Sequence, residues 1–367
     1  MGIDPNRTRR WISGVEPAKE VLAADGTQIL EMECREQPAR LLDLIQAYTS
    51  DPVIRAQFET LRRLASKPGP VLFLGMGASL CSSISGSVLL QSKGRSCFSL
   101  DAGEWLHYGM PTWGSAALSI LLTTSGESAE LVRLMREGQD NPQALICNNP
   151  SSTCWNQSKL RLPILAGPEY GNATKTYTNA AAASIILAAE IIGASWERDA
   201  ELALQALSAS LDHAFAERSE LEEFCRGAAN IEIIGRGAGY GAAVMGALCI
   251  REMSGFRAAA HTGAGFRHGP NLDVDATHVA IIFALGRVGE LGVKLAAECR
   301  RRGGKVVLVS TEEHDRSDSL YPVRLESVPE PWEGISSIVV PQALTLGMIE
   351  RFGCRLPPRF EYGVMHE

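Results

Sequence analysis

A cluster of hydroxyl side chains follows an apolar segment of strand length in the first half of the chain. The segment 118–122 leads into Thr123-Thr124-Ser125-Gly126-Glu127-Ser128, and a helix-like pattern starts at about Glu127. Hydroxyls, a glycine that lets the backbone approach closely, and the unpaired N–H groups of a helix N-terminus can together hold a phosphate dianion without a lysine. The alternative is that Ser125 to Ser128 only cap the helix.

Two further polar loops favour the ligand-binding interpretation. Gly75-Met76-Gly77-Ala78-Ser79 follows the short apolar run 71–74. Glu169-Tyr170-Gly171-Asn172-Ala173-Thr174-Lys175-Thr176 precedes a long helical segment that runs from about Ala173 to Ala194. Ligands of parallel sheets bind beyond the carboxyl ends of the strands. Three such loops at one sheet edge therefore describe a pocket.

The elements that position these loops occur twice. The loop 75–79 matches Gly235-Arg236-Gly237-Ala238-Gly239, which lies 160 residues further on and also follows a short apolar run. Downstream, 102–107 matches 263–268 at an offset of 161, and both have an aromatic residue two positions before a histidine. A second match at nearly the same offset indicates a duplication.

Strand-length and helix-length segments alternate in both halves. Runs such as Val279 to Phe283 are continuously apolar, which suits parallel strands covered on both faces. The alternation predicts an α/β protein with a doubly wound, mostly parallel sheet in each half, flanked by helices. The helical region 195–225 is the expected linker. We expect strands at 71–74, 96–100, 118–123, 143–147 and 162–165, and then at 231–234, 257–260, 278–284 and 305–310.

Composition narrows the class of partner. The 367 residues carry a formal net charge of −7, which gives no support to nucleic acid or an anionic membrane as a partner. An acidic protein must therefore hold an anionic ligand locally. The nine cysteines include no C-x-x-C pair, which favours a reducing cytoplasm over a disulfide framework or a zinc site. The longest apolar stretch, 180–194, is too short to span a bilayer and contains Glu190.

The loops resemble the motifs of the SIS (sugar isomerase) domain family. Thr123 to Ser128 resembles its S-x-S-G-x-[ST] phosphate loop, Gly75 to Ser79 its G-x-G-x-S turn, and Glu169 to Lys175 its E-x-x-V-A-S-T-K segment. Residues 247–254 and 266–270 resemble the A-L-K-x-K-E-x-S and E-x-[KR]-H-G-P motifs of the isomerase half of glucosamine-6-phosphate synthase. Residues 32–38 resemble the E-x-x-E-Q-P helix that precedes that module.

The resemblance implies two tandem SIS domains and a division of roles between them. It implies an N-terminal arm and helix at 1–48, a phosphosugar-binding domain at 49–205, a catalytic domain at 206–352, and a tail over the site at 353–367. It implies that Glu252 is the proton-transfer base. His268 would be the ring-opening or leaving-group acid, given by the neighbouring subunit of a homodimer. No metal or organic cofactor is expected. The implied ligands of the sugar phosphate are Gly77, Ala78, Ser79, Thr123, Thr124, Ser125, Ser128, Ala173, Thr174 and Lys175.

The chain departs from the synthase pattern in three places. Met245 stands where the pattern has a glutamate, Cys249 where it has a lysine, and Gly363 where the tail has the lysine that opens the sugar ring as an imine. Imine formation needs a primary amine, so this departure puts that step in doubt. Gly2 stands where the glutamine-hydrolysing domain has its cysteine nucleophile. Supply of ammonia from glutamine is therefore not expected.

The expected function is an enzyme that acts on an amino-sugar or ketosamine (Amadori-type) 6-phosphate by proton transfer between C1 and C2, with or without release of the amine, as in a deglycase or deaminase. One carboxylate above the C1–C2 edge can take and return that proton, and a histidine can shuttle a proton near neutral pH. A regulatory protein that binds the sugar phosphate without turnover is the alternative, and ammonia-dependent glucosamine-6-phosphate synthesis is a third. Loops near Trp105, Tyr108 and Trp332 would line the pocket for the amine part.

Overall fold

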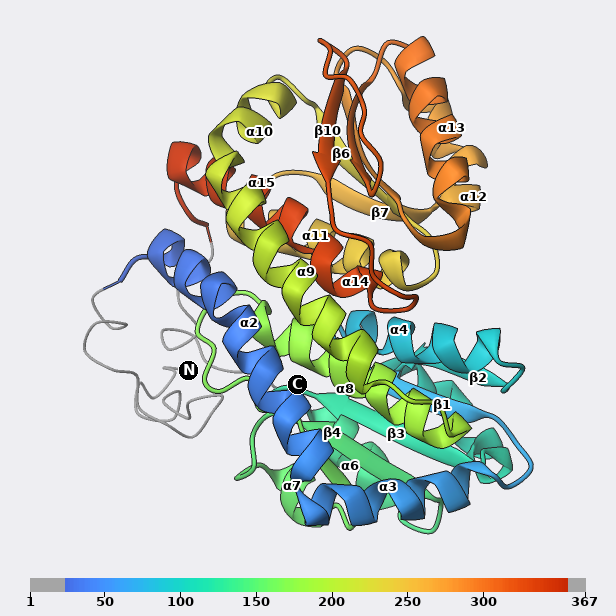
Figure 1. The fold of residues 1–367 in the computed structure, drawn as a ribbon. Helices are drawn as coiled ribbons and strands as arrows, with labels where there is room; N and C mark the ends of the chain where they lie inside the picture. The colour runs from blue at the N-terminus through green and yellow to red at the C-terminus, as the bar shows by residue number, and fades with distance from the viewer. Residues whose placement is uncertain (1–23, 356–367) are drawn as a thin grey trace, which may run out of the picture. The chain divides into compact units, whose positions relative to one another are not determined.

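The computed structural model describes residues 24–355, which form two compact units (Figure 1). Within the described range, unit 1 spans residues 24–198 and unit 2 spans residues 199–355. Each unit contains one parallel five-stranded sheet flanked by helices. The position of Gly363 and the rest of the expected tail from 356 onward lie outside the described residues, as do residues 1–23.

The sheet of unit 1 has the strand order β2-β1-β3-β4-β5, and every neighbouring pair is parallel. The strands β1, β3 and β4 are almost completely buried, which fits their mostly apolar sequences. The strands are β1 (Val71–Gly75), β2 (Cys97–Asp101), β3 (Leu118–Thr123), β4 (Gln143–Cys147) and β5 (Arg161–Pro163).

Helices cover both faces of this sheet. One face packs with α6 and α7 in a single apolar cluster. On the other, α4 and α8 lie against each other, and at their contact a side chain on Gly86 would lie 2.5 Å from the carbonyl oxygen of Ser184. The helical elements are α4 (Ala78–Ser92), α5 (Ala102–Glu104), η1 (Trp105–Gly109), η2 (Met110–Ser115), α6 (Ala129–Glu137), α7 (Thr153–Gln157) and α8 (Lys175–Ile192).

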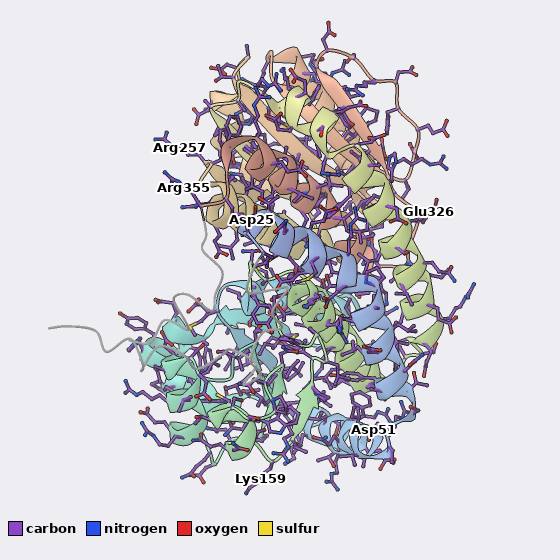
Figure 2. The ribbon with its side chains drawn as sticks, turned by 90° about the vertical axis from the view of Figure 1, so that its left-hand side faces the viewer. Asp25, Asp51, Lys159, Arg257, Glu326 and Arg355 are labelled. Atoms are coloured by element: carbon purple, nitrogen blue, oxygen red, sulfur yellow. The ribbon has the colours of Figure 1, made fainter. Side chains whose placement is uncertain are left out.

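Two helices precede the sheet, and an aspartate begins each. Asp25 starts α2 (Gly26–Ser50) in a capping box with Gln28. Asp51 ends α2 and accepts the N–H groups of Val53 and Ile54 at the start of α3 (Pro52–Ala65). Figure 2 shows Asp25 and Asp51 at the two ends of α2. Both α2 and α3 pack against α8.

Unit 2 repeats the topology of unit 1. Its strand order, β7-β6-β8-β9-β10, is that of unit 1 with each strand replaced by its repeat, and all pairs are parallel. The strands are β6 (Asn230–Gly235), β7 (Ala258–Thr262), β8 (His278–Ala284), β9 (Lys305–Ser310) and β10 (Leu320–Arg324). Its helical elements are α10 (Arg218–Cys225), α11 (Ala238–Ser254), α12 (Gly263–Arg267), η3 (Pro270–Asp273), η4 (Gly286–Val288), α13 (Gly289–Arg301), α14 (Glu333–Ser337) and α15 (Val339–Phe352).

The duplication extends to individual backbone angles. Gly77 and Gly237, 160 residues apart, both have φ of 53° and begin the helix after the first strand. Gly126 and Gly286 share the same spacing, with φ of 68° and 63°. Gly246, which repeats Gly86, meets Pro341 of α15 as Gly86 meets α8. The predicted pair of doubly wound sheets is confirmed. The predicted linker region is helical: α9 (Glu197–Ala216) and α10 occupy it.

Within residues 24–355, none of the helices has the length and apolar character needed to cross a membrane.

Candidate functional site

The phosphate-loop candidates lie at the point where the strand order of unit 1 reverses. From β1 the chain moves outward to β2, and it then returns to the other side of β1 to form β3. In open parallel sheets, a reversal of the strand order places a ligand-binding crevice at the carboxyl ends of the two strands concerned, which here are β1 and β3. The structure brings together there the two loops 75–79 and 123–128 that the sequence singled out.

Local hydrogen bonds give the loop after β3 its shape. Thr123 Oγ1 accepts the N–H of Gly126 at 3.0 Å, and Ser125 Oγ accepts the N–H of Glu127 at 3.2 Å. The carboxylate of Glu127 accepts two bonds from Thr153, from its N–H at 2.9 Å and from its Oγ1 at 2.8 Å. The loop is thus held by its own hydroxyls and by the neighbouring segment.

The simple capping alternative does not describe Ser128. Helix α6 begins at Ala129, and Ser128 is its N-cap residue, yet the Ser128 side chain makes no capping hydrogen bond. The hydroxyl that would cap the helix is therefore not used for that purpose. A helix N-terminus without a side-chain cap, next to the hydroxyls of Thr124 and Ser128, is suited to an anion.

The loop after β1 brings the second helix N-terminus to the same crevice. Gly77 adopts a positive φ of 53° and begins α4 without a side-chain cap. Ala78 and Ser79 occupy the first turn of α4. Gly75 lies close to the next turn, because a Cβ there would lie 3.0 Å from the backbone of Ser79.

The third loop is packed into the interior of unit 1. Ala173, Thr174 and Lys175 are all less than 5% exposed. Lys175 Nζ forms an ion pair with Glu36 at 2.6 Å, and Thr174 Oγ1 donates to Glu169 at 2.9 Å. The side chains of Thr174 and Lys175 are therefore engaged with α2 and with their own loop. Sequence reasoning placed Glu36 and Glu169 in motifs but assigned them no role, although the helical spacing of Glu33, Glu36 and Gln37 shows that they share a face.

The candidate base lies in unit 2, near the end of α11. Glu252 is half-buried, and its charge contributes to the raised pKa of Cys249, so the two side chains are close. Burial is the main cause that raises the pKa of the Cys249 thiol, to about 12. Cys249 and Met245 are both buried, so both belong to the core of unit 2.

The candidate acid lies directly after α12. His268 is exposed, its N–H donates to the carbonyl of Gly265 at 3.1 Å, and Gly269 follows with φ of 135°. The preceding residue, Arg267, forms a two-pronged ion pair with Glu298 at 2.9 and 3.1 Å. The Arg267 side chain is thus engaged within unit 2.

The crevice of unit 2 lacks the hydroxyls of unit 1. At an offset of 160, Phe283, Ala284, Leu285 and Val288 replace Thr123, Thr124, Ser125 and Ser128. Gly239 likewise replaces Ser79. The turn is kept, since Gly286 repeats the positive φ of Gly126, but the polar groups are lost. The hydroxyl cradle is thus a property of unit 1.

The aromatic residues expected near the amine pocket differ in exposure. Tyr108 is 79% exposed and lies in the π-helical turn η1 together with Trp105. Trp332 is buried in unit 2, so its ring contributes to the core of that unit. Among residues 24–355, no group of three or more acidic, histidine or cysteine side chains is arranged to hold a metal ion.

Comparisons with known proteins agree with this architecture. The chain is 27% identical over 296 residues to glutamine–fructose-6-phosphate aminotransferase (isomerizing) from Zymomonas mobilis, a match that covers 77% of this chain and 49% of that protein. The chain thus spans about half the length of this curated relative.

Solved structures show the same fold. The C-terminal domain of glucosamine-fructose-6-phosphate aminotransferase from Francisella tularensis superposes with a TM-score of 0.79 at 19% identity, covering 93% of this chain and 99% of that one. Tagatose-6-phosphate ketose/aldose isomerase from Escherichia coli superposes with a TM-score of 0.73 at 20% identity, covering 96% and 99%. The family model of the SIS domain matches this sequence twice, over residues 64–190 and 226–346, one match in each half. The chain belongs to the SIS domain family.

Proposed function

We propose that the protein is an enzyme that acts on an amino-sugar or ketosamine 6-phosphate by proton transfer between C1 and C2. The observation that carries this proposal is the loop 123–128, which lies at the crevice of unit 1 with its hydroxyls gathered beside a helix N-terminus that no side chain caps. Such a loop is suited to the phosphate end of the substrate. The similarity to glutamine–fructose-6-phosphate aminotransferase supports a sugar 6-phosphate and an amine group as parts of the substrate.

Glu252 and His268 supply the chemistry in this proposal. The carboxylate of Glu252 takes the proton from one of C1 and C2 and returns it to the other, through an enediol or enolamine. His268 gives a proton to the ring oxygen as the ring opens. Where the amine is released, the C1/C2 proton transfer gives an imine, water adds to the imine carbon, and His268 protonates the nitrogen as the C–N bond breaks. In a homodimer, His268 would come from the neighbouring subunit, and its exposure on the described chain suits that role.

The cysteines support a cytoplasmic location. All nine lie within the described residues, and all are free thiols. Eight of the nine are buried. This pattern is typical of proteins that function in a reducing compartment.

Substrate assays test the reaction. The purified protein is incubated with fructosamine 6-phosphates and with glucosamine 6-phosphate, and amine and hexose phosphate are measured. Glu252→Gln keeps the shape of the side chain and removes the base, so turnover should fall by at least about a hundredfold. Glu326→Gln, an exposed change in the same unit, serves as the control. Full turnover by Glu252→Gln would refute the mechanism.

A non-catalytic sugar-phosphate sensor is the second candidate. Cys249 favours it, since no amine is available at the position where the synthase pattern has a lysine. Binding measured by calorimetry, together with the substrate assays, would distinguish the two functions. Binding of a sugar 6-phosphate without conversion of any tested substrate would support the sensor, and conversion of any of them would support the enzyme.

A further inference from the structure

One face of α2 carries a row of polar groups that contact the segment 169–179. Glu33, Glu36, Gln37 and Arg40 occupy positions i, i+3, i+4 and i+7 of the helix. Glu36 pairs with Lys175 at 2.6 Å. Gln37 accepts from Thr178 Oγ1 at 2.5 Å, and the carbonyl of Arg40 accepts from Asn179 Nδ2 at 2.8 Å. This face of α2 therefore contacts successive residues at the start of α8.

Glu33 binds the backbone of the loop itself. Its carboxylate accepts the N–H of Tyr170 in a short hydrogen bond and the N–H of Gly171 at 3.2 Å. The contact is tight, because a Cβ on Gly171 would lie 3.0 Å from Glu33 Oε2. The Glu33 side chain is completely buried. An acceptor from α2 thus satisfies two backbone donors that the loop cannot satisfy alone.

Glu169 holds the same loop from its other end. It accepts the N–H groups of Thr174 and Thr176 at 2.9 and 3.2 Å, and both threonine hydroxyls donate to it. Thr174 is the N-cap residue of α8, and its own side chain makes no capping bond. Glu169 therefore replaces the usual cap. Glu33 and Glu169 together fix the loop at both ends.

Burial of these charges is costly unless they are neutralised. The groups that act on Glu33 are Glu169, Tyr170 and Gly171 of the loop and Lys175 of α8. Glu36 of the same helix acts on Tyr170 and pairs with Lys175. Burial is the largest cause that raises the pKa of Glu33, to about 8, and the charge of Glu169 raises it further. Lys175 and the two N–H donors act in the opposite direction and do not reverse the shift.

We infer that Glu33 is a positioning residue: from α2 it fixes the conformation of the loop 169–175, the third loop of the proposed sugar-phosphate site. The inference rests on the proposed function for the identity of the ligand. A rigid supporting contact of this kind reduces the cost of ordering a binding loop. That role accounts for the fully buried carboxyl group on α2.

Hydrogen exchange and binding, measured on the full chain, test the inference. Glu33→Ala removes the acceptor, so exchange in the peptide 169–176 should rise about tenfold or more. The affinity for fructose 6-phosphate should fall about tenfold, and where turnover is measured the loss should be in KM and not in kcat. Glu33→Gln keeps one acceptor oxygen without a charge and should restore both exchange protection and affinity. Glu31→Gln, on the same helix in an ion pair with Arg35, is the matched control.

The pH dependence separates positioning from a general loss of stability. Ionisation of Glu33 as the pH rises through about 8 should weaken the binding of fructose 6-phosphate by the wild type, and Glu33→Gln should lack this decline. Unchanged exchange in Glu33→Ala overturns the inference, and so does raised exchange with unchanged affinity. Raised exchange in Glu33→Ala supports the role of Glu33 even if the wild type binds no sugar phosphate, a result that instead counts against the proposed function.

Discussion

Gly126 shows how much of the phosphate loop depends on a single residue. Its φ of 68° is one that residues with a side chain rarely adopt. A Cβ at this position would also lie 2.1 Å from Ser152 Oγ. Thr123 Oγ1 accepts the Gly126 N–H, so any shift of Gly126 also moves a hydroxyl of the cradle.

Gly126→Ala should therefore both destabilise unit 1 and weaken phosphate binding. The strain and the overlap together cost about 2–4 kcal/mol, enough to lower the Tm of unit 1 by several degrees. Gly193→Ala is the matched control, because Gly193 has φ of 69° and a Cβ there would meet no atom within 4 Å. It should cost only about 1 kcal/mol, the backbone component alone. Equal Tm values for the two variants, measured by differential scanning calorimetry, would show that contact with Ser152 is unimportant.

The residues at the crevice could be predicted because their chemistry is local. A run of hydroxyl residues and a glycine between a strand and a helix can be recognised from the sequence alone. The role of Glu33 could not be predicted in this way. Its partners, Tyr170 and Gly171, lie more than 130 positions away along the chain, and they contribute backbone groups that carry no sequence signal.

Among the elements, the buried strands were predicted to within about two residues, because continuous apolar runs bounded by polar loops are distinctive. β10 (Leu320–Arg324) was not predicted. It is an edge strand with a proline at its centre, two features that weaken the strand pattern. The π-helical turn at 105–109 was also not predicted, since nothing in Trp105-Leu106-His107-Tyr108-Gly109 marks that hydrogen-bonding pattern.

The first turn of α14 contains a second carboxyl group with a shifted pKa. Burial is the largest cause that raises the pKa of Glu333, to about 7, with the charge of Glu330 acting in the same direction and Arg287 in the opposite one. The folded state therefore binds a proton more tightly than the unfolded chain does. The protonated Glu333 carboxyl therefore contributes to stability. This contribution is fully present below the usual glutamate pKa of about 4.5 and is lost as the pH rises through about 7.

Glu333→Gln should remove this pH dependence. The amide resembles the neutral acid, so the variant should match the wild type near pH 5 and exceed its Tm near pH 8. Thermal unfolding at the two pH values measures the difference. Glu326→Gln, at the exposed site labelled in Figure 2, should follow the wild type at both pH values. A wild-type advantage that persists at pH 8 would show that the ionised carboxylate is the stabilising form.

Across the whole chain, duplication has given two sheets with one topology and two different crevices. Unit 1 keeps the hydroxyls and unit 2 carries Glu252 and His268. The repeat could be predicted from glycines that a shared backbone requires, as at Gly77 and Gly237. The amine part of the substrate could not be predicted, because the sequence departs from the synthase pattern at Met245, Cys249 and Gly363.

Subunit complementation tests the proposed homodimer and its shared site together. Ser125→Ala impairs the phosphate loop and His268→Ala removes the acid, so each homodimer alone should be nearly inactive. If His268 acts in the partner's site, a mixed dimer contains one site that has both an intact loop and an intact histidine. After random reassociation half of the dimers are mixed, so activity should recover to about a quarter of the wild-type value. Mixing Ser125→Ala with Glu252→Gln is the control for which subunit supplies the base, because recovery there requires the base to cross as well. Absence of recovery in the first mixture, with mixed dimers verified by mass spectrometry, would place His268 in the site of its own chain.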